Sequence, residues 1–496
     1  MKTLKIFALV CSLLWFNSCK DFDELQNDPN RTTLAHPSLI LTNLEISTFG
    51  NTENGNNISV GAALASRMMV FTDDSDDNQY YTWQRSSFNR YNQLRQVVKM
   101  NEEADRVELP NYKALGLFFQ SVIILEITKV FGDVPYSESL AGTSQSPKYD
   151  LQSDIYLKVL NDLDAANTSL SEANGAIDGD IIYGGDIKSW KRLINSYTLR
   201  VLISLSKHSE NTALQVKTRF SKIVNDPVKY PIMTSNDHNG DLPFVDQSTA
   251  TSTLLGNRYP FYNNNSFKTA YYMDESFVNL LKDFEDPRLF VMADKKPQGG
   301  ALPADDPDAY GGLDGSAPLA TNITRLVNGE ASKVNPRYYS NPVNEPSVLM
   351  GYAEVEFTLA EAAELDWTTG DAEEHYLNGI EASMGFYGVS SDYDDYILEA
   401  GIAYVPATGI EQIITQKYIN FFLQGGWEAF YNHERTGFPL FKVDGGAVQN
   451  GGVVPKRWMY PNDEFTLNLP SVQAAVARQY PAGDNINGVM WLWQND

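Results

Sequence analysis

The strongest constraint on the fold is an apolar stretch with helical periodicity at residues 111–136, "NYKALGLFFQSVIILEITKVFGDVPY". Apolar or small residues recur there at i, i+3, i+4, i+7, i+8 and i+11: Ala114, Leu117, Phe118, Ser121, Val122 and Leu125. This spacing places them on one face of an α-helix. Gly132 and Pro135, near the end of the stretch, predict where the helix ends.

Five further segments carry the same period and predict helices: 150–170, 186–207, 352–367, 371–388 and 410–437. They come in hairpin-like pairs, which favours stacked helix pairs of the tetratricopeptide kind, although the repeat consensus is missing. Between them lie three stretches rich in Gly, Pro, Asn and Asp, at 49–92, 226–272 and 296–347, which predict loops and short strands. The predicted fold is therefore mainly α, with tetratricopeptide-like helix pairs and a loop-rich second half containing short strands.

The first residues, "MKTLKIFALVCSLLWFNSC", have the order of an export signal. Lys2 and Lys5 precede an apolar run at 6–16, which is shorter than the roughly 20 apolar residues that a membrane span needs. A buried N-terminal helix is the alternative, but polar chain follows the run at once. We therefore predict that residues 1–18 are a signal peptide and leave them out of fold reasoning.

Cys19 ends this leader and resembles the lipidated cysteine of a bacterial lipobox. Phe16 and Asn17 depart from the usual pattern, which has Leu three positions before the cysteine and small residues between. A thiolate is a good nucleophile for thioether formation, and each buried methylene of an acyl chain contributes about 0.8 kcal/mol to membrane binding. We expect Cys19 to be the lipid anchor. The alternative is an ordinary cleaved signal with a free cysteine.

The sequence after the cysteine, "KDFDE", resembles the signal that directs lipoproteins of the Bacteroidetes type to the outer face of the outer membrane. It also fits a charged, solvated tether. The predicted organisation is a lipidated N-terminus and tether at 19–35 and one domain at 36–496, since no clear linker divides the rest.

Charge and cysteine content exclude several classes of function. The formal charge is −25 and becomes about −27 without Lys2 and Lys5, which makes nucleic acid an implausible partner. No cysteine follows Cys19, which excludes a disulfide framework, a thiol catalyst and a cysteine metal site in the mature chain.

Sequence motifs of catalysis are missing. None of the five histidines forms an H-E-x-x-H pair, and the chain lacks the G-x-S-x-G, P-loop and G-x-G-x-x-G patterns. A glycosidase needs two carboxylates at a fixed separation, and 63 acids supply many pairs that the sequence cannot place. The prediction is that the protein is not an enzyme; a secreted glycan-processing hydrolase with an unrecognised carboxylate pair is the alternative, and a purely structural surface protein is a weaker one.

Several segments together resemble the SusD/RagB family of outer-membrane lipoproteins. They occur in the family's order from Cys19 to about Asn468: "KALGLFFQSVIILEITKVFGDVPYSESL", "PKYDLQSDIYLKVLNDLDAANTSL", "DIKSWKRLINSYTLRVLISLSK", "EDPRLFVM", "YAEVEFTLAEAAE", "YLNGIEASMGFYG", "QKYINFFLQGGWEAFYNHERTGFP" and "PKRWMYPNDEFTLN". No single motif is decisive, but their order and spacing are specific.

The resemblance implies a surface-exposed binding protein that is a lid over a TonB-dependent transporter of the SusC type. Such a protein captures oligosaccharides, or in some members peptides, and delivers them to the transporter. The resemblance also implies that the membrane is contacted through the lipid anchor only. It does not identify the glycan or peptide.

Aromatic residues in the loops are the candidate ligand-binding residues, because Tyr and Trp offer flat apolar faces with one polar edge. In the early loop an acidic run precedes a cluster of aromatic and donor side chains: Tyr80, Tyr81, Trp83 and Arg85. By resemblance to relatives with known glycan sites, middle loops add further candidates: Tyr259, Tyr262, Asn263, Tyr338 and Tyr339. For each residue, packing onto the loop beneath it is the alternative.

The acidic run itself is a weak calcium candidate, because closely spaced carboxylates suit that cation. Its acids are Asp73, Asp74, Asp76 and Asp77, and they lack the Gly and terminal Glu of an EF-hand loop. A solvated acidic loop is the favoured interpretation, so no cofactor is expected beyond possible calcium.

Overall fold

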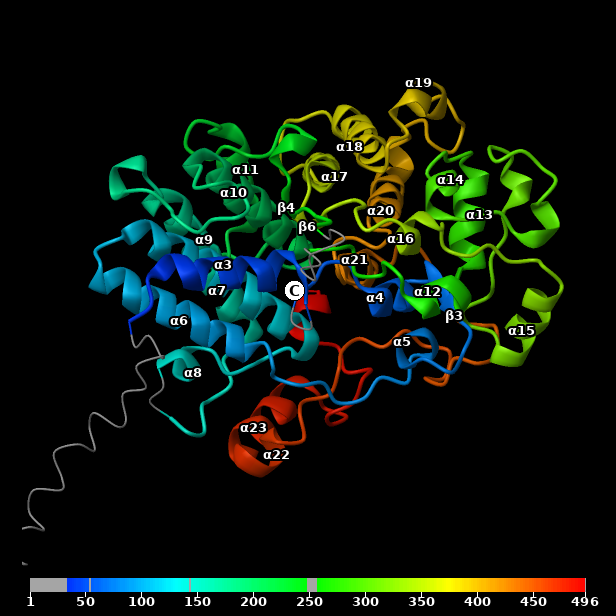
Figure 1. Cartoon of the computed structure of the whole chain (residues 1–496). Coiled ribbons are helices and arrows are strands. Elements are labelled where there is room, and N and C mark those ends of the chain that lie inside the picture. The colour runs from blue at the N-terminus through cyan, green and yellow to red at the C-terminus, as the bar shows by residue number, and fades with distance from the viewer. Residues whose placement is uncertain (1–33, 53–54, 142–143, 248–256, 496) are drawn as a thin grey trace, which may run out of the picture.

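The computed structural model describes residues 34–52, 55–141, 144–247 and 257–495. Helices dominate this part of the chain (Figure 1). The longer helices are α3 (Pro37–Phe49), α6 (Tyr91–Arg106), α7 (Pro110–Phe131), α9 (Gln152–Ser169), α10 (Ile187–Ser204), α11 (Val216–Asn225), α13 (Glu275–Asp283), α15 (Leu319–Val327), α17 (Tyr352–Glu364), α18 (Ala372–Tyr387), α20 (Gly409–Asn420), α21 (Glu428–Thr436) and α23 (Leu469–Gln479).

Short helices and strands make up the rest. The short helices are α4 (Val60–Ala65), α5 (Asp77–Tyr80), α8 (Ser137–Ala141), α12 (Asn265–Thr269), α14 (Leu289–Met292), α16 (Arg337–Ser340), α19 (Tyr393–Tyr396) and α22 (Glu464–Leu467). The strands are β1 (Asn51–Thr52), β2 (Gly55–Asn56), β3 (Met69–Phe71), β4 (Gly240–Leu242), β5 (Tyr271–Met273) and β6 (Ser347–Met350). They pair as three antiparallel ribbons, β1–β2, β3–β5 and β4–β6.

The predicted stacking of helix pairs is confirmed, although α6 was not predicted and the helix predicted at 410–437 is two helices, α20 and α21. Helices α6 and α7, α9 and α10, and α17 and α18 pack as consecutive pairs, and α10 contacts α17 across a long insertion. Helix α20 then packs on both α17 and α18. This arrangement is the tetratricopeptide-like stack that the periodicity indicated.

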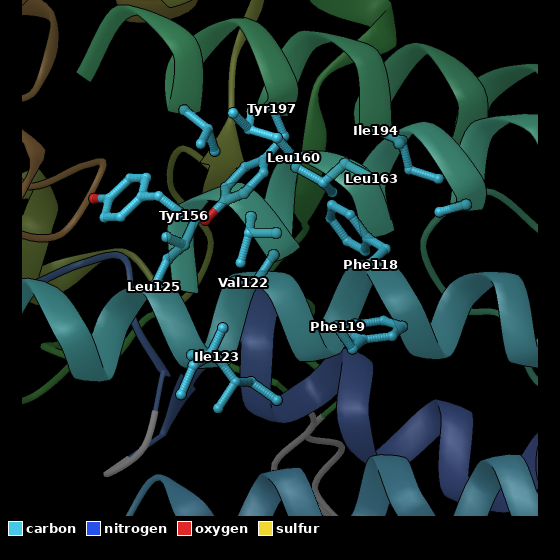
Figure 2. Close-up of a cluster of buried hydrophobic side chains, with 14 of the residues drawn as sticks. Phe118, Phe119, Val122, Ile123, Leu125, Tyr156, Leu160, Leu163, Ile194 and Tyr197 are labelled. Atoms are coloured by element: carbon cyan, nitrogen blue, oxygen red, sulfur yellow. The ribbon is translucent and has the colours of Figure 1, made fainter. Parts of the chain in front are cut away.

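Helix α7 is the centre of the helical stack. It is buried on nearly all sides, because α6 and α9 pack against it and α3 covers a further face. Figure 2 shows Phe118 and Val122 of α7 directed toward Leu160 and Leu163 of α9. Helix α7 ends as predicted, with Gly132 as the C-cap residue at a φ of 89°.

This burial also explains why α7 is long and apolar enough to cross a membrane. Within the described residues it is the one helix that meets that criterion, and 83% of its apolar window is buried inside the protein. A helix that is apolar all round suits the core of a large protein as well as a bilayer, and here protein surrounds it.

The loop-rich part contains the three predicted stretches, 49–92, 226–272 and 296–347. It is assembled from residues 50–90, the insertion between α10 and α17, and the chain after α21. Pairing of β3 with β5 joins the first segment to the insertion. Figure 1 places these elements mostly on one side of the molecule, beside the helical stack.

Candidate functional site

Tyr81 and Trp83 of the early loop point into the protein, which corrects their prediction as ligand residues. Tyr81 is fully buried, and its hydroxyl donates to the carbonyl of Ala65 at 2.7 Å. Trp83 is 2% exposed and stacks on Trp458, with 3.7 Å between ring centroids and 9° between planes. The chain turns inward after α5 because Tyr81 adopts a left-handed conformation, with φ of 57°.

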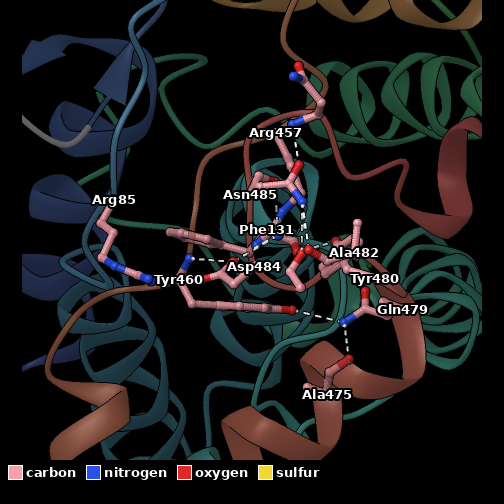
Figure 3. A network of polar contacts seen from close by, with 12 residues as sticks. Arg85, Phe131, Arg457, Tyr460, Ala475, Gln479, Tyr480, Ala482, Asp484 and Asn485 are labelled. Atoms are coloured by element: carbon pink, nitrogen blue, oxygen red, sulfur yellow. Dashed lines mark hydrogen bonds and ion pairs between the residues drawn. The ribbon is translucent and has the colours of Figure 1, made fainter.

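Tyr80 and Arg85 also hold the fold together. Tyr80 is 5% exposed and donates to the carbonyl of Ala317 at 3.3 Å. The Arg85 guanidinium donates to the Tyr460 carbonyl at 2.7 Å and forms an ion pair with Asp484 at 2.5 Å (Figure 3). The prediction is wrong for Tyr80, which is buried, and Arg85 is committed to these partners while its side chain keeps 30% exposure.

The same network holds the segment around Arg457 in the fold. Arg457 is fully buried between the rings of Tyr460 and Tyr480 and pairs with Asp484 at 2.9 Å. Figure 3 also shows the hydrogen bond from Gln479 to the Tyr460 hydroxyl, at 2.9 Å. These contacts connect the chain after α21 to the start of the loop-rich part.

Among the middle-loop candidates, Tyr259 and Tyr338 are buried, and their prediction as ligand residues is also wrong. Each is 2% exposed, and their ring centroids lie 5.9 Å apart. The Tyr259 N–H donates to the Pro342 carbonyl at 2.8 Å, which holds the two loops face to face. Both rings are therefore part of the buried aromatic core of the loop-rich part.

Tyr262, Asn263 and Tyr339 keep the accessibility that ligand binding requires. Asn263 is exposed, whereas Tyr262 and Tyr339 are half-buried. The Asn263 N–H donates to the Tyr339 carbonyl at 2.9 Å, so the structure brings the two middle loops together. The Arg258 guanidinium lies 5.1 Å from the centre of the Tyr262 ring.

Two further aromatic residues, which were not predicted from the sequence, lie in this region. Phe71 of β3 and Tyr271 of β5 are half-buried, with ring centroids 4.9 Å apart. Below them, Phe267 lies 4.8 Å from Tyr271 and stacks on Phe261 at 3.8 Å. The sequence feature that could have indicated them is the Tyr271–Tyr272 doublet. Its position beside the early loop depends on the pairing of β5 with β3. We call the four half-buried rings the aromatic loop surface: Phe71, Tyr262, Tyr271 and Tyr339.

The acidic run lies beside this surface, and three of its four acids accept hydrogen bonds from nearby residues of the same loop. Asp76 caps α5 by accepting from the N–H groups of Asn78 and Gln79, at 2.8 and 3.2 Å. Asp74 accepts from the Ser75 N–H at 2.7 Å. Asp77 accepts from the Thr82 hydroxyl.

No metal-binding group forms from these acids. Throughout the part of the chain that the structure describes, no three His, Cys, Asp or Glu side chains gather in a way that would hold a metal ion. Burial, and then the carboxylates of Asp76 and Asp73, raise the pKa of Tyr271, which places these two acids near the aromatic loop surface.

Glu45 and Asp180 form a close pair of acids, as the active site of a hydrolase requires. Glu45 is fully buried, and burial followed by the nearby Asp180 raises the pKa of Glu45 to about 9. Glu45 accepts from the Ile181 N–H at 2.9 Å, and Asp180 accepts from the indole of Trp190 at 2.7 Å. Glu45 is enclosed by protein, and the half-buried Asp180 also accepts from the N–H groups of Tyr183 and Gly185, so the pair stabilises the turn before α10.

Comparisons of sequence and of structure relate this chain to known proteins. The family model described as "Starch-binding associating with outer membrane", SusD-like, matches residues 29–461. None of the curated proteins matches the chain. The match to the family model extends over both the helical stack and the loop-rich part.

Solved structures agree with the family match. A SusD homologue from Bacteroides fragilis is 36% identical, with a TM-score of 0.84, and the alignment covers 93% of this chain and all of that one. An outer-membrane protein from Bacteroides vulgatus connected with nutrient binding is 35% identical, with the same TM-score and coverage. A chitin-binding protein is 26% identical, with a TM-score of 0.72 and the same coverage.

Proposed function

This chain belongs to the SusD-like family of outer-membrane-associated, nutrient-binding proteins, and from that membership we propose that it captures oligosaccharides at the cell surface. SusD-like proteins are binding proteins rather than enzymes. The observation that carries the proposal is the aromatic loop surface, where four half-buried rings come from three segments that strand pairing and a backbone hydrogen bond bring together.

The chemistry of this surface suits a sugar. Flat apolar faces pack on the C–H faces of a pyranose ring, while Asn263 and Arg258 supply hydrogen bonds to its hydroxyls. The similar chitin-binding protein supports a glycan over a peptide as the ligand class. No observation favours the hydrolase alternative, because three of the four acids of the acidic run are engaged by hydrogen bonds within their own loop.

We extend the proposal to the place where capture occurs. Cys19, outside the described residues, is the lipid anchor, and the "KDFDE" segment directs the protein to the outer face of the outer membrane. The captured oligosaccharide passes to a TonB-dependent transporter of the SusC type. Co-purification of such a barrel with the full chain from outer membranes checks the partner, and its absence contradicts this part.

A binding experiment tests capture. The full chain in detergent is titrated calorimetrically with soluble oligosaccharides derived from chitin, from starch and from other plant or microbial polysaccharides. We expect one class to bind, and Tyr262→Ala and Tyr339→Ala each to weaken that affinity about tenfold, or about 1.4 kcal/mol. Tyr393→Ala is the control, because this half-buried tyrosine lies on α19, away from the aromatic loop surface. If no oligosaccharide binds, or both variants bind like the parent, the proposal is wrong.

The anchor has its own test. We expect Cys19→Ala to move the protein from the membrane fraction to the soluble fraction, because no acyl chain is then attached. A Cys11→Ala variant is the control, since Cys11 lies inside the predicted signal peptide. A Cys19→Ala protein that stays fully membrane-bound contradicts lipidation.

A further inference from the structure

A separate cavity lies between the helical stack and the loop-rich part. Its volume is about 280 Å³, and its walls come from α7, α10, the segment 86–90 and the segment 425–431. None of the nine predicted ligand residues lines it. Segments more than 300 residues apart therefore enclose a space that is separate from the aromatic loop surface.

Charged groups in the cavity wall are already neutralised in pairs. Arg90 pairs with Glu126, Lys129 pairs with Glu428 at 2.7 Å, and Arg200 donates to both carboxylate oxygens of Glu354. Burial raises the pKa of Glu428, but Lys129 and Arg200 outweigh it and lower the pKa overall, so this carboxylate is ionised. The wall thus presents fixed donors and acceptors with no net charge to attract an ion.

Two tyrosine hydroxyls in the wall make no hydrogen bond to any residue that the structure describes. They belong to Tyr197, which is 4% exposed, and to the half-buried Tyr431. Neither hydroxyl oxygen is fully enclosed by protein, so both are available to a molecule inside the cavity. The indole of Trp427 and the Tyr431 ring add aromatic surface to the same wall.

The size and opening of the cavity limit what it can hold. Ser87 and Asn89 are exposed and line it, so one rim reaches solvent. Its volume lies just under the roughly 300–1,000 Å³ of ordinary small-molecule sites, which suits one ring rather than a chain. A neighbouring cavity beyond Arg200 and Leu349 measures only about 30 Å³, which is enough for water.

We propose that this cavity binds one neutral polyhydroxylated ring, a single sugar residue. The unpartnered tyrosine hydroxyls and the fixed charges hydrogen-bond the ring's hydroxyl groups, and the aromatic side chains pack on its apolar faces. This site is independent of the aromatic loop surface and goes beyond oligosaccharide capture, because it holds a single ring inside the protein.

The test uses the full chain in detergent with glucose, galactose and N-acetylglucosamine, detected by saturation-transfer NMR and titration. We expect at least one to bind, and Ser87→Trp, which fills the rim, to weaken binding about tenfold or more. Gln84→Trp adds the same ring at an exposed position outside the cavity and is the matched control. Tyr197→Phe removes one hydroxyl and should weaken binding roughly threefold to tenfold.

Circular dichroism verifies folding of each variant, and Asn89→Trp replaces Ser87→Trp if the latter does not fold. For a neutral ligand the affinity stays constant between about 0.01 and 1 M salt, over which the screening length falls from roughly 30 to 3 Å. The proposal is overturned if none of the three sugars binds, if Ser87→Trp binds like the parent, or if affinity falls with salt. Loss of monosaccharide binding in Tyr262→Ala alone would place the sugar on the aromatic loop surface and overturn only the cavity proposal.

Discussion

Trp83 shows how one side chain can hold distant parts of this protein together. Its ring stacks on Trp458 and meets Trp427 edge-on at 5.6 Å, and Phe430 lies 5.1 Å away. These partners come from the chain after α20, more than 340 residues later. Aromatic pairs in such geometries contribute about 0.5–1.5 kcal/mol each beyond the burial of their area.

Replacing Trp83 should therefore destabilise the fold rather than remove a ligand contact. We expect Trp83→Ala to lower the free energy of unfolding by about 3–5 kcal/mol. The half-exposed Tyr262 is the comparison, and Tyr262→Ala should cost less than about 1 kcal/mol. Urea unfolding of both variants measures this, and equal losses would contradict the assignment of Trp83 to the core.

Glu434 is a second residue for which burial matters, because it shifts the pKa of the carboxyl group. Its side chain is 1% exposed and forms an ion pair with Lys456 at 2.8 Å. Burial raises its pKa from the ordinary 4.5 to about 7, and Lys456 only partly opposes this. The native state thus holds a proton on Glu434 in a pH range where the unfolded chain has lost it.

The sign of the pH dependence follows from linkage. Between about pH 4.5 and 7 the native state binds more protons than the unfolded state, so the contribution of Glu434 to stability falls as pH rises. The fall is on the order of 1.4 kcal/mol per unit of pKa difference. We expect the stability of the parent relative to Glu434→Gln to decrease across that range, as measured by urea unfolding at several pH values. A difference that is flat or rises with pH would contradict it.

Among single helices, α18 shows how capping residues at the two ends define where a helix begins and stops. Asp371 accepts hydrogen bonds from the N–H groups of Glu373 and Glu374 at 3.0 and 3.3 Å, and Gly388 ends the helix with φ of 77°. Both signals are readable in the sequence segment "DAEEHYLNGIEASMGFYG". An N-cap side chain satisfies backbone donors that the helix cannot pair internally.

Removing this cap should weaken α18 by a predictable amount. We expect Asp371→Ala to lower the free energy of unfolding by about 0.5–2 kcal/mol. Asp371→Asn, which keeps an acceptor oxygen, is the matched control and should stay near the parent. Chemical unfolding followed by helical circular dichroism distinguishes the two, and equal destabilisation by both variants would show that the cap is not the cause.

Elements inside the predicted loops were harder to foresee. Helix α15 (Leu319–Val327) lies in the stretch 296–347, where Gly and Pro indicated loops, and only Asn322 of this helix is buried. Helix α4 is six residues long and buried at its C-terminal four residues, next to β3. Such short elements depend on tertiary contacts, because isolated helices of this length are marginal in water.

At the scale of the whole molecule, buried ion pairs join separate helix pairs. Arg200 of α10 pairs with Glu354 of α17, and Arg435 of α21 pairs with Glu361 of α17. All four side chains are nearly inaccessible, from 1% to 6% exposed. Removing one partner leaves an uncompensated buried charge, which is strongly unfavourable.

Breaking the Arg200 pair should therefore affect the entire fold. We expect Glu354→Ala to lower the free energy of unfolding by about 3–5 kcal/mol, whereas the double change of Arg200→Met with Glu354→Leu should recover much of it. Equilibrium unfolding of the parent, the single and the double variant checks this. A double variant as unstable as the single one would mean that packing, and not the unpaired charge, sets the cost.

Helices α7, α9, α10, α17 and α18 could be predicted from the sequence, because helical periodicity is a local property of neighbouring residues. Helix α7 and its end at Gly132 follow from residues 110–132 alone. Helix α6 and the break between α20 and α21 were not predicted. Which aromatics face solvent depends on the folded chain, because the direction of Trp83 or Tyr259 is set by partners that lie far away in the sequence. The cavity beside Tyr197 arose in the same way, since its walls meet only when the helical stack closes against the loop-rich part.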